Sequence, residues 1–479
     1  MKCGVVFLVV ACAAFRPLAP KRALPRLRSA TLESIEAAEA VGSGAYIGSV
    51  ATAETAIPEG GPRPGATEND AFECDASVAA WAAFQRDGPR PAAENLRRAA
   101  GVAASRAAGG PRALAYWAGH AARTAYFVGN ALAGTTAFDA SRRLSGGGPS
   151  ASSSEAAGFG QSQGVLPGLD AAVASRLLLE AMLTYEQDFE KIEAGLLVAP
   201  WDMTLGHRQN RLSYSGLQTL RFLREATATL GRRAALAEPR RSWPGENADE
   251  YPSYYLNDFH YQSDGWLSER SANVYETSTE TLFVGRQDAM QRQTLVPLAR
   301  MAREPESVLE VACGTGRFAT FTRDRFPDAD MTIVDLSRQY LAKAEENDAY
   351  WRSRSGRGKK PVAAVRANAE DLPFDDASFD AVTCVYLFHE LPADARAAVA
   401  GELARVVKPG GTVVFTDSIQ RGDRPDLDEN LDLFENMNEP HYPSYVREDL
   451  AALFGAAGLE PGYKSVASTS KTLSFVKPN

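Results

Sequence analysis

From residue 305 to the C-terminus, short apolar runs alternate with segments of helical periodicity. Strands are predicted at 307–311, 330–334, 362–367, 379–387, 411–417, 462–468 and 472–476. Helices are expected between most of them, at about 316–324, 337–350, 393–407 and 446–457. This alternation predicts an α/β fold built on a doubly wound, Rossmann-like sheet of seven strands. No helix separates the last two strands, so we expect them to form an antiparallel hairpin at one edge.

Helical periodicity also marks the part of the chain before the sheet. An α-helical domain at 111–245 is predicted by apolar spacing over 112–144, 169–195 and 215–236. Residues 41–110 precede it and are rich in Ala, Gly and Pro, so we expect them to be weakly ordered.

Between the helical domain and the sheet, residues 246–304 form an aromatic-rich lead-in and a helix at about 274–301. Tyr, Phe, Trp and His are densest at 251–275, where they alternate with polar residues. Aromatic side chains of this density can line a pocket for a flat ligand, or they can pack the helical domain onto the sheet. The sequence leaves these two alternatives open.

The first 40 residues have the composition of a targeting leader. Lys2 precedes a short apolar run that ends in small residues, and a basic, acid-poor segment follows from Phe15 onward. A signal-like run joined to a transit-like segment resembles the bipartite plastid leader of algae with secondary plastids, with plain secretion as the alternative. No other stretch approaches the roughly 20 apolar residues of a membrane span, which leaves peripheral contact with a membrane open.

Composition excludes some classes of binding partner and of bound metal. The formal net charge of -9 argues against a nucleic-acid binder, because phosphate contacts need clustered Lys and Arg. The five cysteines show no metal-ligand spacing, and we expect them to be reduced, with no metal site.

The candidate chemistry begins where the first predicted strand ends. Gly314 and Gly316 allow a tight turn that brings a ligand close to the backbone. Asp335 ends the second strand, where an acid can bind the two hydroxyls of a ribose. These residues match a dinucleotide fingerprint, but the carboxylate of Glu310 would repel a pyrophosphate. It would attract the ammonium and sulfonium of S-adenosylmethionine.

The segment 310–316 resembles the first motif of class I S-adenosylmethionine-dependent methyltransferases. Three further segments, 367–374 with 378–380, 386–391 and 403–411, resemble later motifs of that class in the same order. The resemblance covers residues 305–479 and is nearest to the small-molecule, quinone-type branch (methyltransferase type 11). It implies cofactor contacts from Glu310, Ala312, Cys313, Gly314, Thr315, Gly316, Asp335, Leu336, Asn368, Ala369 and Tyr386.

Two of these positions depart from the family pattern. The family usually has Gly where Ala312 stands, and usually Asp where Asn368 stands. Ala312 adds only a methyl group, and the carbonyl oxygen of Asn368 can still accept a hydrogen bond from the adenine amine. We therefore expect cofactor binding to be retained.

Methyl transfer rests on positioning and on exclusion of water, and a base is needed only if the acceptor must lose a proton. The candidates for this role are His389, Glu390 and His441, with Asp417 also near the end of a strand. His441 lies in the insertion 418–445, which resembles a substrate lid. His260 is either a pocket residue or part of the packing between domains.

These features predict a methyltransferase that acts on a small molecule, with a plastid prenylquinone or pigment precursor as acceptor. A nicotinamide-dependent oxidoreductase is the less favoured enzyme, because of Glu310 and of the motif 408–411. A non-catalytic plastid assembly factor on the same fold is the third alternative, because the additional helical domain gives it a surface for partners.

Overall fold

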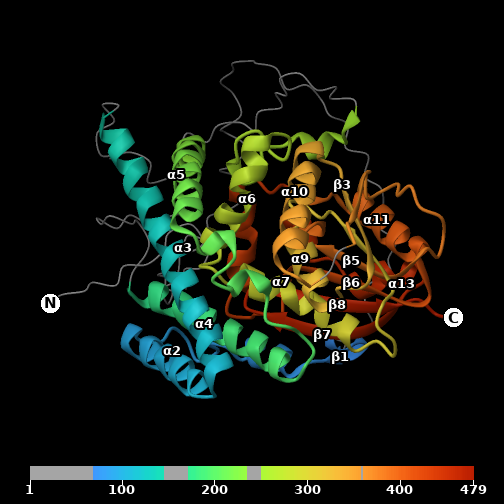
Figure 1. Ribbon diagram of the computed structural model, residues 1–479, viewed down its shortest axis with the longest axis horizontal. Coiled ribbons are helices and arrows are strands. Elements are labelled where there is room, and N and C mark those ends of the chain that lie inside the picture. The colour runs from blue at the N-terminus through green and yellow to red at the C-terminus, as the bar shows by residue number, and fades with distance from the viewer. Residues whose placement is uncertain (1–67, 145–170, 235–249, 358–359) are drawn as a thin grey trace, which may run out of the picture. The chain divides into compact units, whose positions relative to one another are not determined.

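The computed structural model describes residues 68–144, 171–234, 250–357 and 360–479 (Figure 1). The predicted leader and the first part of the predicted weakly ordered segment lie outside these residues. Every helix within the described ranges falls short of the length or the apolarity that crossing a bilayer requires.

A mixed sheet of eight strands forms the centre of the described structure, in the order β1-β7-β8-β6-β5-β2-β3-β4. Neighbouring strands are parallel except that β8 runs antiparallel to both β6 and β7. The predicted α/β class and the antiparallel C-terminal hairpin are confirmed. The strands are β1 (Glu73–Cys74), β2 (Ser307–Val311), β3 (Asp330–Asp335), β4 (Ala363–Arg366), β5 (Phe379–Val385), β6 (Val407–Ser418), β7 (Glu460–Ala467) and β8 (Ser470–Val476).

The eighth strand comes from a part of the chain for which we predicted weak order. β1 pairs in parallel with β7, so the C-terminal hairpin lies one strand inside the edge of the sheet rather than at it. The residues that follow form α1 (Ala76–Ala82) and α2 (Ala92–Ala107). The prediction was wrong over these residues because alanine, which is common in linkers, also has the highest helix propensity.

The two faces of the sheet are covered by different helices, as in other doubly wound sheets. Leu309 belongs to the larger core, which includes residues of α11 and α13, whereas its neighbour Val308 belongs to a second core with residues of α8 and α9. Successive residues of a strand face opposite sides, so both sides of β2 are buried. The helices of this region are α8 (Leu295–Ala299), α9 (Arg317–Arg325), α10 (Arg338–Arg354), α11 (Ala393–Val406), α12 (Tyr442–Tyr445) and α13 (Leu450–Ala456).

The helices that precede the sheet pack on one another and on the start of the sheet domain. α2 packs on α4, and α3 packs on both α5 and α6 (Figure 1). The predicted single helix over 274–301 is instead interrupted, because Val284 and Gly285 have positive φ values of 61° and 84°. The helices are α3 (Pro111–Leu144), α4 (Ala171–Glu193), α5 (Leu212–Ala234), α6 (Glu269–Leu282) and α7 (Gln287–Gln291).

The two glycines of the turn after β2 are required for different structural reasons. Both have positive φ, +54° at Gly314 and +69° at Gly316. A Cβ added at Gly314 would meet open space, whereas one at Gly316 would lie 2.8 Å from the Cβ of Ala344 in α10. Gly314 therefore leaves room beside the backbone, and Gly316 allows the start of α9 to approach α10.

We expect Gly316→Ala to lower the free energy of unfolding by about 2–5 kcal/mol. A left-handed conformation costs a residue with a Cβ about 1–2 kcal/mol, and forcing a methyl group into a packed contact adds about 1–3 kcal/mol. Gly314→Ala is the matched control and should cost only the first amount. Urea denaturation of both variants measures the difference, and equal losses would contradict the proposed close approach of α9 and α10.

Candidate active site

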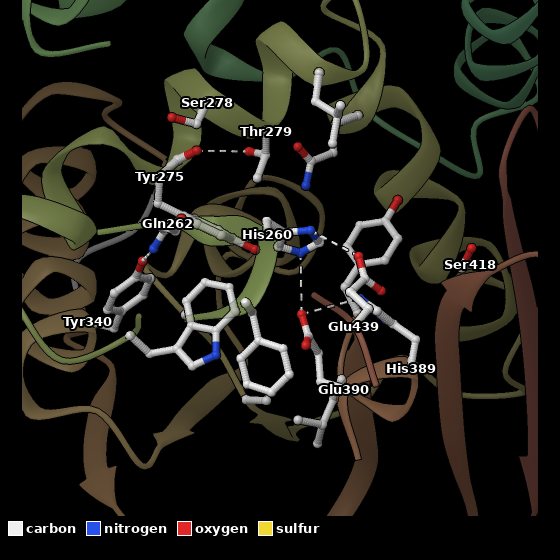
Figure 2. Close-up of a pocket in the computed structure, with 18 of the residues that line it drawn as sticks. His260, Gln262, Tyr275, Ser278, Thr279, Tyr340, His389, Glu390, Ser418 and Glu439 are labelled. Carbon is white, nitrogen blue, oxygen red and sulfur yellow. Dashed lines mark hydrogen bonds and ion pairs between the residues drawn. The ribbon is translucent and has the colours of Figure 1, made fainter. Parts of the chain in front are cut away.

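A cavity of about 310 Å³ opens where the parallel strands of the sheet end (Figure 2). Residues that follow β2, β3 and β5 line one part of it, at the edge of the sheet where α/β proteins bind ligands. Much of the rest is lined by the segment 254–287 and the helices α3 and α5, and residues of 418–442 and 469–470 close the remaining side. The sheet and the helices before it therefore build this cavity together.

Seven of the eleven predicted cofactor residues line the cavity and four do not. Thr315 is turned away, because its hydroxyl donates to Glu276 Oε1 at 2.9 Å. Cys313 belongs to a small buried apolar cluster, and Gly316 is in contact with α10. Glu310 is the fourth, and its carboxyl is almost fully buried. The lining residues are Ala312, Gly314, Asp335, Leu336, Asn368, Ala369 and Tyr386.

The carboxyl group of Asp335 is held in place by backbone donors. Its Oδ2 accepts from the N–H of Gly314 and its Oδ1 from the N–H of Ser337, both at 2.8 Å. Burial raises the pKa of Asp335 to about 6, although these backbone hydrogen bonds favour the ionised form. Each oxygen keeps a second lone pair, so the group can accept two further hydrogen bonds from the cavity.

Glu310 lies behind this surface with part of its hydrogen-bonding capacity unused. Its Oε2 has no hydrogen-bond partner among the described residues. Burial, and secondarily the charge of Asp335, raise the pKa of Glu310 well above its usual range. A buried carboxyl without a partner is costly, so this position favours the approach of a cation or of a hydrogen-bond donor.

Two lining residues have left-handed backbone conformations at the ends of strands. φ is 59° at Ala312, after β2, and 56° at Tyr386, after β5. Ala312 thus has the conformation that favours Gly, the residue usual in the family that its motif resembles. The hydroxyl of Tyr386 lies 2.7 Å from the Oγ of Ser470, so this ring is held against β8.

Asn368 is held in a local turn with Glu370. Its Oδ1 accepts from the N–H of Glu370 and its amide donates to Glu370 Oε1, both at 3.2 Å. The amide orientation is thereby fixed, and Oδ1 retains a lone pair toward the cavity that Asn368 lines.

Two of the three predicted catalytic candidates meet in the cavity. His389 Nδ1 lies 2.5 Å from Asp417 Oδ1, and His389 Nε2 lies 3.5 Å from Glu390 Oε1. Burial lowers the pKa of His389, but the charge of Asp417 and the hydrogen bonds outweigh burial and raise it well above its usual range. The third candidate, His441, is not among the residues lining the cavity, and its ring lies against Tyr254.

A second histidine completes this group, and sequence reasoning left its role undecided. His260 Nε2 also lies 3.5 Å from Glu390 Oε1, and its Nδ1 lies 2.9 Å from Glu439 Oε1 (Figure 2). Burial lowers the pKa of His260, but the charges of Glu439 and Glu390 outweigh it and raise the pKa to about 10. The sequence gives no local pattern that marks Glu439, because its partner is 179 residues away.

The aromatic block fulfils both of the alternatives that the sequence left open. Phe259, His260 and Trp266 line the cavity, so part of the block does face a ligand site. Trp266 also stacks on Phe259 at 5.9 Å and meets the ring of Tyr340 edge-on at 5.7 Å. The block therefore forms a cavity wall and attaches that wall to α10.

A network of charged residues fastens the glycine turn to the helical region. Arg317, the first residue of α9, pairs with Asp288 and with Asp202 of the Pro-Trp-Asp-Met segment. Arg123 of α3 pairs with the same two acids and with Glu280, which it reaches at 2.8 Å. Burial favours a protonated Asp202, but the two guanidinium groups lower its pKa to about 2.

Residues 308–411 match a methyltransferase domain family. The matched region begins in β2 and ends in β6, so it contains the turn after β2, Asp335 and the His389–Glu390 pair. This part of the chain is therefore similar to methyltransferase domains, and the curated relatives that match the chain include quinone methyltransferases by name, such as demethylmenaquinone methyltransferases.

The chain is similar over part of its length to several curated proteins. It is 36% identical over 117 residues to a demethylmenaquinone methyltransferase of Deinococcus radiodurans, covering 24% of this chain and 45% of the relative. It is 34% identical over 177 residues to the O-methyltransferase cnsE of Penicillium expansum, covering 36% and 58%. The chain thus spans about half the length of these relatives. An O-methyltransferase family protein from Burkholderia thailandensis aligns with a TM-score of 0.37 and 18% identity, covering 64% of this chain and 88% of that structure.

We expect Ala312→Gly to raise the free energy of unfolding by about 0.5–1 kcal/mol. Glycine relieves the left-handed strain of about 1–2 kcal/mol but makes the unfolded chain more flexible. The matched control is Ala319→Gly within α9, where the same change should destabilise by about 1 kcal/mol or more. Urea denaturation measures both variants, and a loss of stability in Ala312→Gly would contradict this account of the turn.

Proposed function

We propose that the protein is an S-adenosylmethionine-dependent methyltransferase whose acceptor is a small molecule with a polar head and an apolar tail, such as a prenylquinone. One observation carries the proposal: a single cavity is lined by Asp335 and Asn368, by the His389–Glu390 pair and by apolar residues of three helices. The cavity therefore offers a cofactor end, a polar acceptor end and an apolar wall.

The cofactor end fits S-adenosylmethionine in charge and in hydrogen bonding. Asp335 would accept from the ribose hydroxyls with the lone pairs that the backbone leaves free, and Leu336 and Ala369 would contact adenine. The unpartnered Oε2 of Glu310 and the open space beside Gly314 suit the methionyl part with its ammonium. When bound, the cofactor supplies an electrophilic methyl group, whose bonding electron pair stays on sulfur as the acceptor gains the methyl and gives up a proton.

The apolar wall supports an acceptor with a hydrocarbon tail. Ligand sites of this kind bind mainly by burying apolar surface, at about 0.8 kcal/mol for each CH₂ group. Side chains of α3, α5 and the end of α6 line the cavity together, and these helices pack directly on one another. They are Ala131, Gly134, Thr135, Phe222, Ala226, Leu230, Leu282 and Phe283.

The acceptor head would lie at His389 and Glu390, after β5. There the side chains of this chain can orient an oxygen or an activated ring carbon toward the methyl group and exclude water, which are the contributions that methyl transfer needs. Tyr442 and Ser418 line the same end and are joined by a 2.6 Å hydrogen bond, so they close one side of it.

The cellular setting that we propose is the plastid, on the basis of the leader-like composition of residues 1–40. Contact with a membrane surface would give access to an apolar acceptor. Leu205, Leu212 and Leu220 are exposed, with fractions of 93%, 91% and 67%, and are the side chains that such contact would use.

Calorimetric titration tests the proposed cofactor directly. We expect saturable binding of S-adenosylmethionine, no binding of NAD, and a loss of about 100-fold in affinity in Asp335→Ala, since two hydrogen bonds to a charged group disappear. Binding of NAD alone would refute the proposal. Full activity of Asp335→Ala in cells would instead indicate a structural, non-catalytic role for the fold.

The affinity for S-adenosylmethionine measured in this titration should depend on pH. Asp335 becomes protonated as the pH falls through about 6, and a neutral carboxyl accepts hydrogen bonds less well. Affinity for the cofactor should therefore fall below pH 6, by as much as about tenfold per unit. In Asp335→Asn the affinity should be lower throughout, and its dependence near pH 6 should disappear.

We expect Ala226→Phe to discriminate between acceptors by tail length. A ring on this face of α5 fills the apolar wall, so KM for a long-tailed demethylated quinol should rise by about tenfold or more, which corresponds to about 1.4 kcal/mol. KM for the tail-less quinol should stay within about twofold, because its head does not reach the wall.

The matched control for this variant is Arg224→Phe, which places the same ring on the exposed side of α5. It should leave both KM values unchanged. If Ala226→Phe raised KM equally for the two quinols, the apolar wall would not be the tail site. Thermal denaturation of both variants separates this effect from a general loss of stability.

A further inference from the structure

Two histidines from distant parts of the chain aim the same ring nitrogen at one carboxylate oxygen. Nε2 of His260 and Nε2 of His389 each lie 3.5 Å from Oε1 of Glu390. One ligand atom from each of the three side chains lies within 4.8 Å of the other two. The three side chains therefore lie together on the wall of the cavity, at the end proposed for the acceptor (Figure 2).

The other nitrogen of each ring lies beside a buried carboxylate: that of His389 is hydrogen-bonded to Asp417, whereas that of His260 makes a close ion-pair contact with Glu439 without hydrogen-bond geometry. Asp417 Oδ1 lies 2.5 Å from Nδ1 of His389, and Glu439 Oε1 lies 2.9 Å from Nδ1 of His260. A carboxylate at Nδ1 places the proton of a neutral imidazole there and leaves the lone pair on Nε2. Histidines that bind metals are oriented in this way, by a second carboxylate behind the ring.

We propose that His260, His389 and Glu390 bind one divalent transition-metal ion, with Asp417 and Glu439 orienting the two imidazoles. The ion's binding stands on these contacts alone, whereas its part in methyl transfer rests on the proposed function. Two imidazoles and one carboxylate, with further positions open, are the ligands of several catalytic metal sites.

The separations and the ligand types agree with such an ion. With bonds of about 2.1 Å in a tetrahedral arrangement, ligand atoms lie about 3.4 Å apart, close to the two observed distances of 3.5 Å. Imidazole ligands suit zinc and its neighbours, whereas magnesium prefers oxygen ligands and retains its water. Zn²⁺ is therefore the ion to test, with Mg²⁺ for comparison.

The charge of the group also favours a cation. Three buried carboxylates, those of Glu390, Asp417 and Glu439, face only two imidazoles, so the group is net negative whichever protonation state the imidazoles take. In the part of the chain that the structure describes, no lysine or arginine forms an ion pair with any of the five side chains. A divalent ion would supply the positive charge that the surrounding protein lacks.

The two halves of the site are preorganised by separate contacts. His260 has a left-handed backbone, with a φ of 55°, and such strain is typical of functional positions. The amide of Asn438 donates to the backbone oxygen of Asp258 at 2.7 Å, which joins the Glu439 segment to the His260 segment. The ligands thus do not depend on a single loop for their arrangement.

At this place the ion would act as a Lewis acid toward the acceptor. An acceptor hydroxyl bound to the ion loses its proton to solvent more readily, because the positive charge stabilises the oxyanion. That oxygen, or the ring carbon that it activates, then forms the bond to the methyl carbon while the carbon–sulfur bond breaks and its electron pair stays on sulfur. No oxidant or reductant is needed.

Zinc titration of the chelator-treated full-length chain tests the site. We expect one Zn²⁺ per chain, bound at least about 100-fold more weakly in His260→Gln and His389→Gln. Glu439→Gln should weaken binding by roughly 10–100-fold, because it removes only the outer carboxylate. His441→Gln is the matched control, a histidine outside the three ligands, and should bind Zn²⁺ as the unmodified chain does. Mg²⁺ should not compete.

The unmodified chain loaded with Co²⁺ provides a test that does not depend on the folding of a variant. Visible ligand-field bands that change when a demethylated quinol is added would support the inference. No saturable Zn²⁺ binding, or equal binding by His260→Gln and His441→Gln, would overturn it. S-adenosylmethionine is titrated in parallel, with chelator present. If the chain binds S-adenosylmethionine but no Zn²⁺, only the proposed metal site is refuted. If it does not bind S-adenosylmethionine, the proposed function itself is refuted.

Discussion

The structure depends on Arg317, which directly follows the glycine turn and has a largely buried side chain. A guanidinium and its carboxylate partners each cost several kcal/mol to bury unless they are paired. Arg317 finds its partners in Asp202 and Asp288, which lie outside the sheet, and Arg123 shares them. These ion pairs therefore tie the turn to the helical region, and within the described residues from 68 onward the two belong to one compact unit.

Because the helical region is attached to the sheet at this turn, the two ends of the cavity are built from different parts of the chain. The sheet supplies the cofactor end from residues that are close in the sequence, since the turn after β2 and Asp335 belong to adjacent strands. The end proposed for the acceptor has contributions from segments far apart, with His260 from the aromatic block and Glu439 from the insertion after β6. A common domain thus carries a common cofactor site, and the specific chemistry comes from the segments packed on it.

The sheet domain could be predicted because its signals are local. Buried parallel strands appear as short apolar runs, and the conformation of Ala312 is marked by the motif in which it stands. The contact between His260 and Glu439 could not be predicted, since nothing near either residue indicates the other. His441 was a reasonable candidate by residue type, yet only the packing of the insertion shows that its neighbour Glu439 points into the cluster. The strand at Glu73–Cys74 is too short to produce an alternating pattern.

That short strand has a consequence for the order in which the chain can fold. β1 joins the sheet through β7, nearly four hundred residues later in the sequence. Contacts of such separation form late, because a long loop must close before any interaction compensates for the lost entropy. The pairing of β1 must therefore wait for the last hairpin to be synthesised, or to pass through any pore that the chain crosses. Until then, the surface of α1 that packs on β7 is available to chaperones.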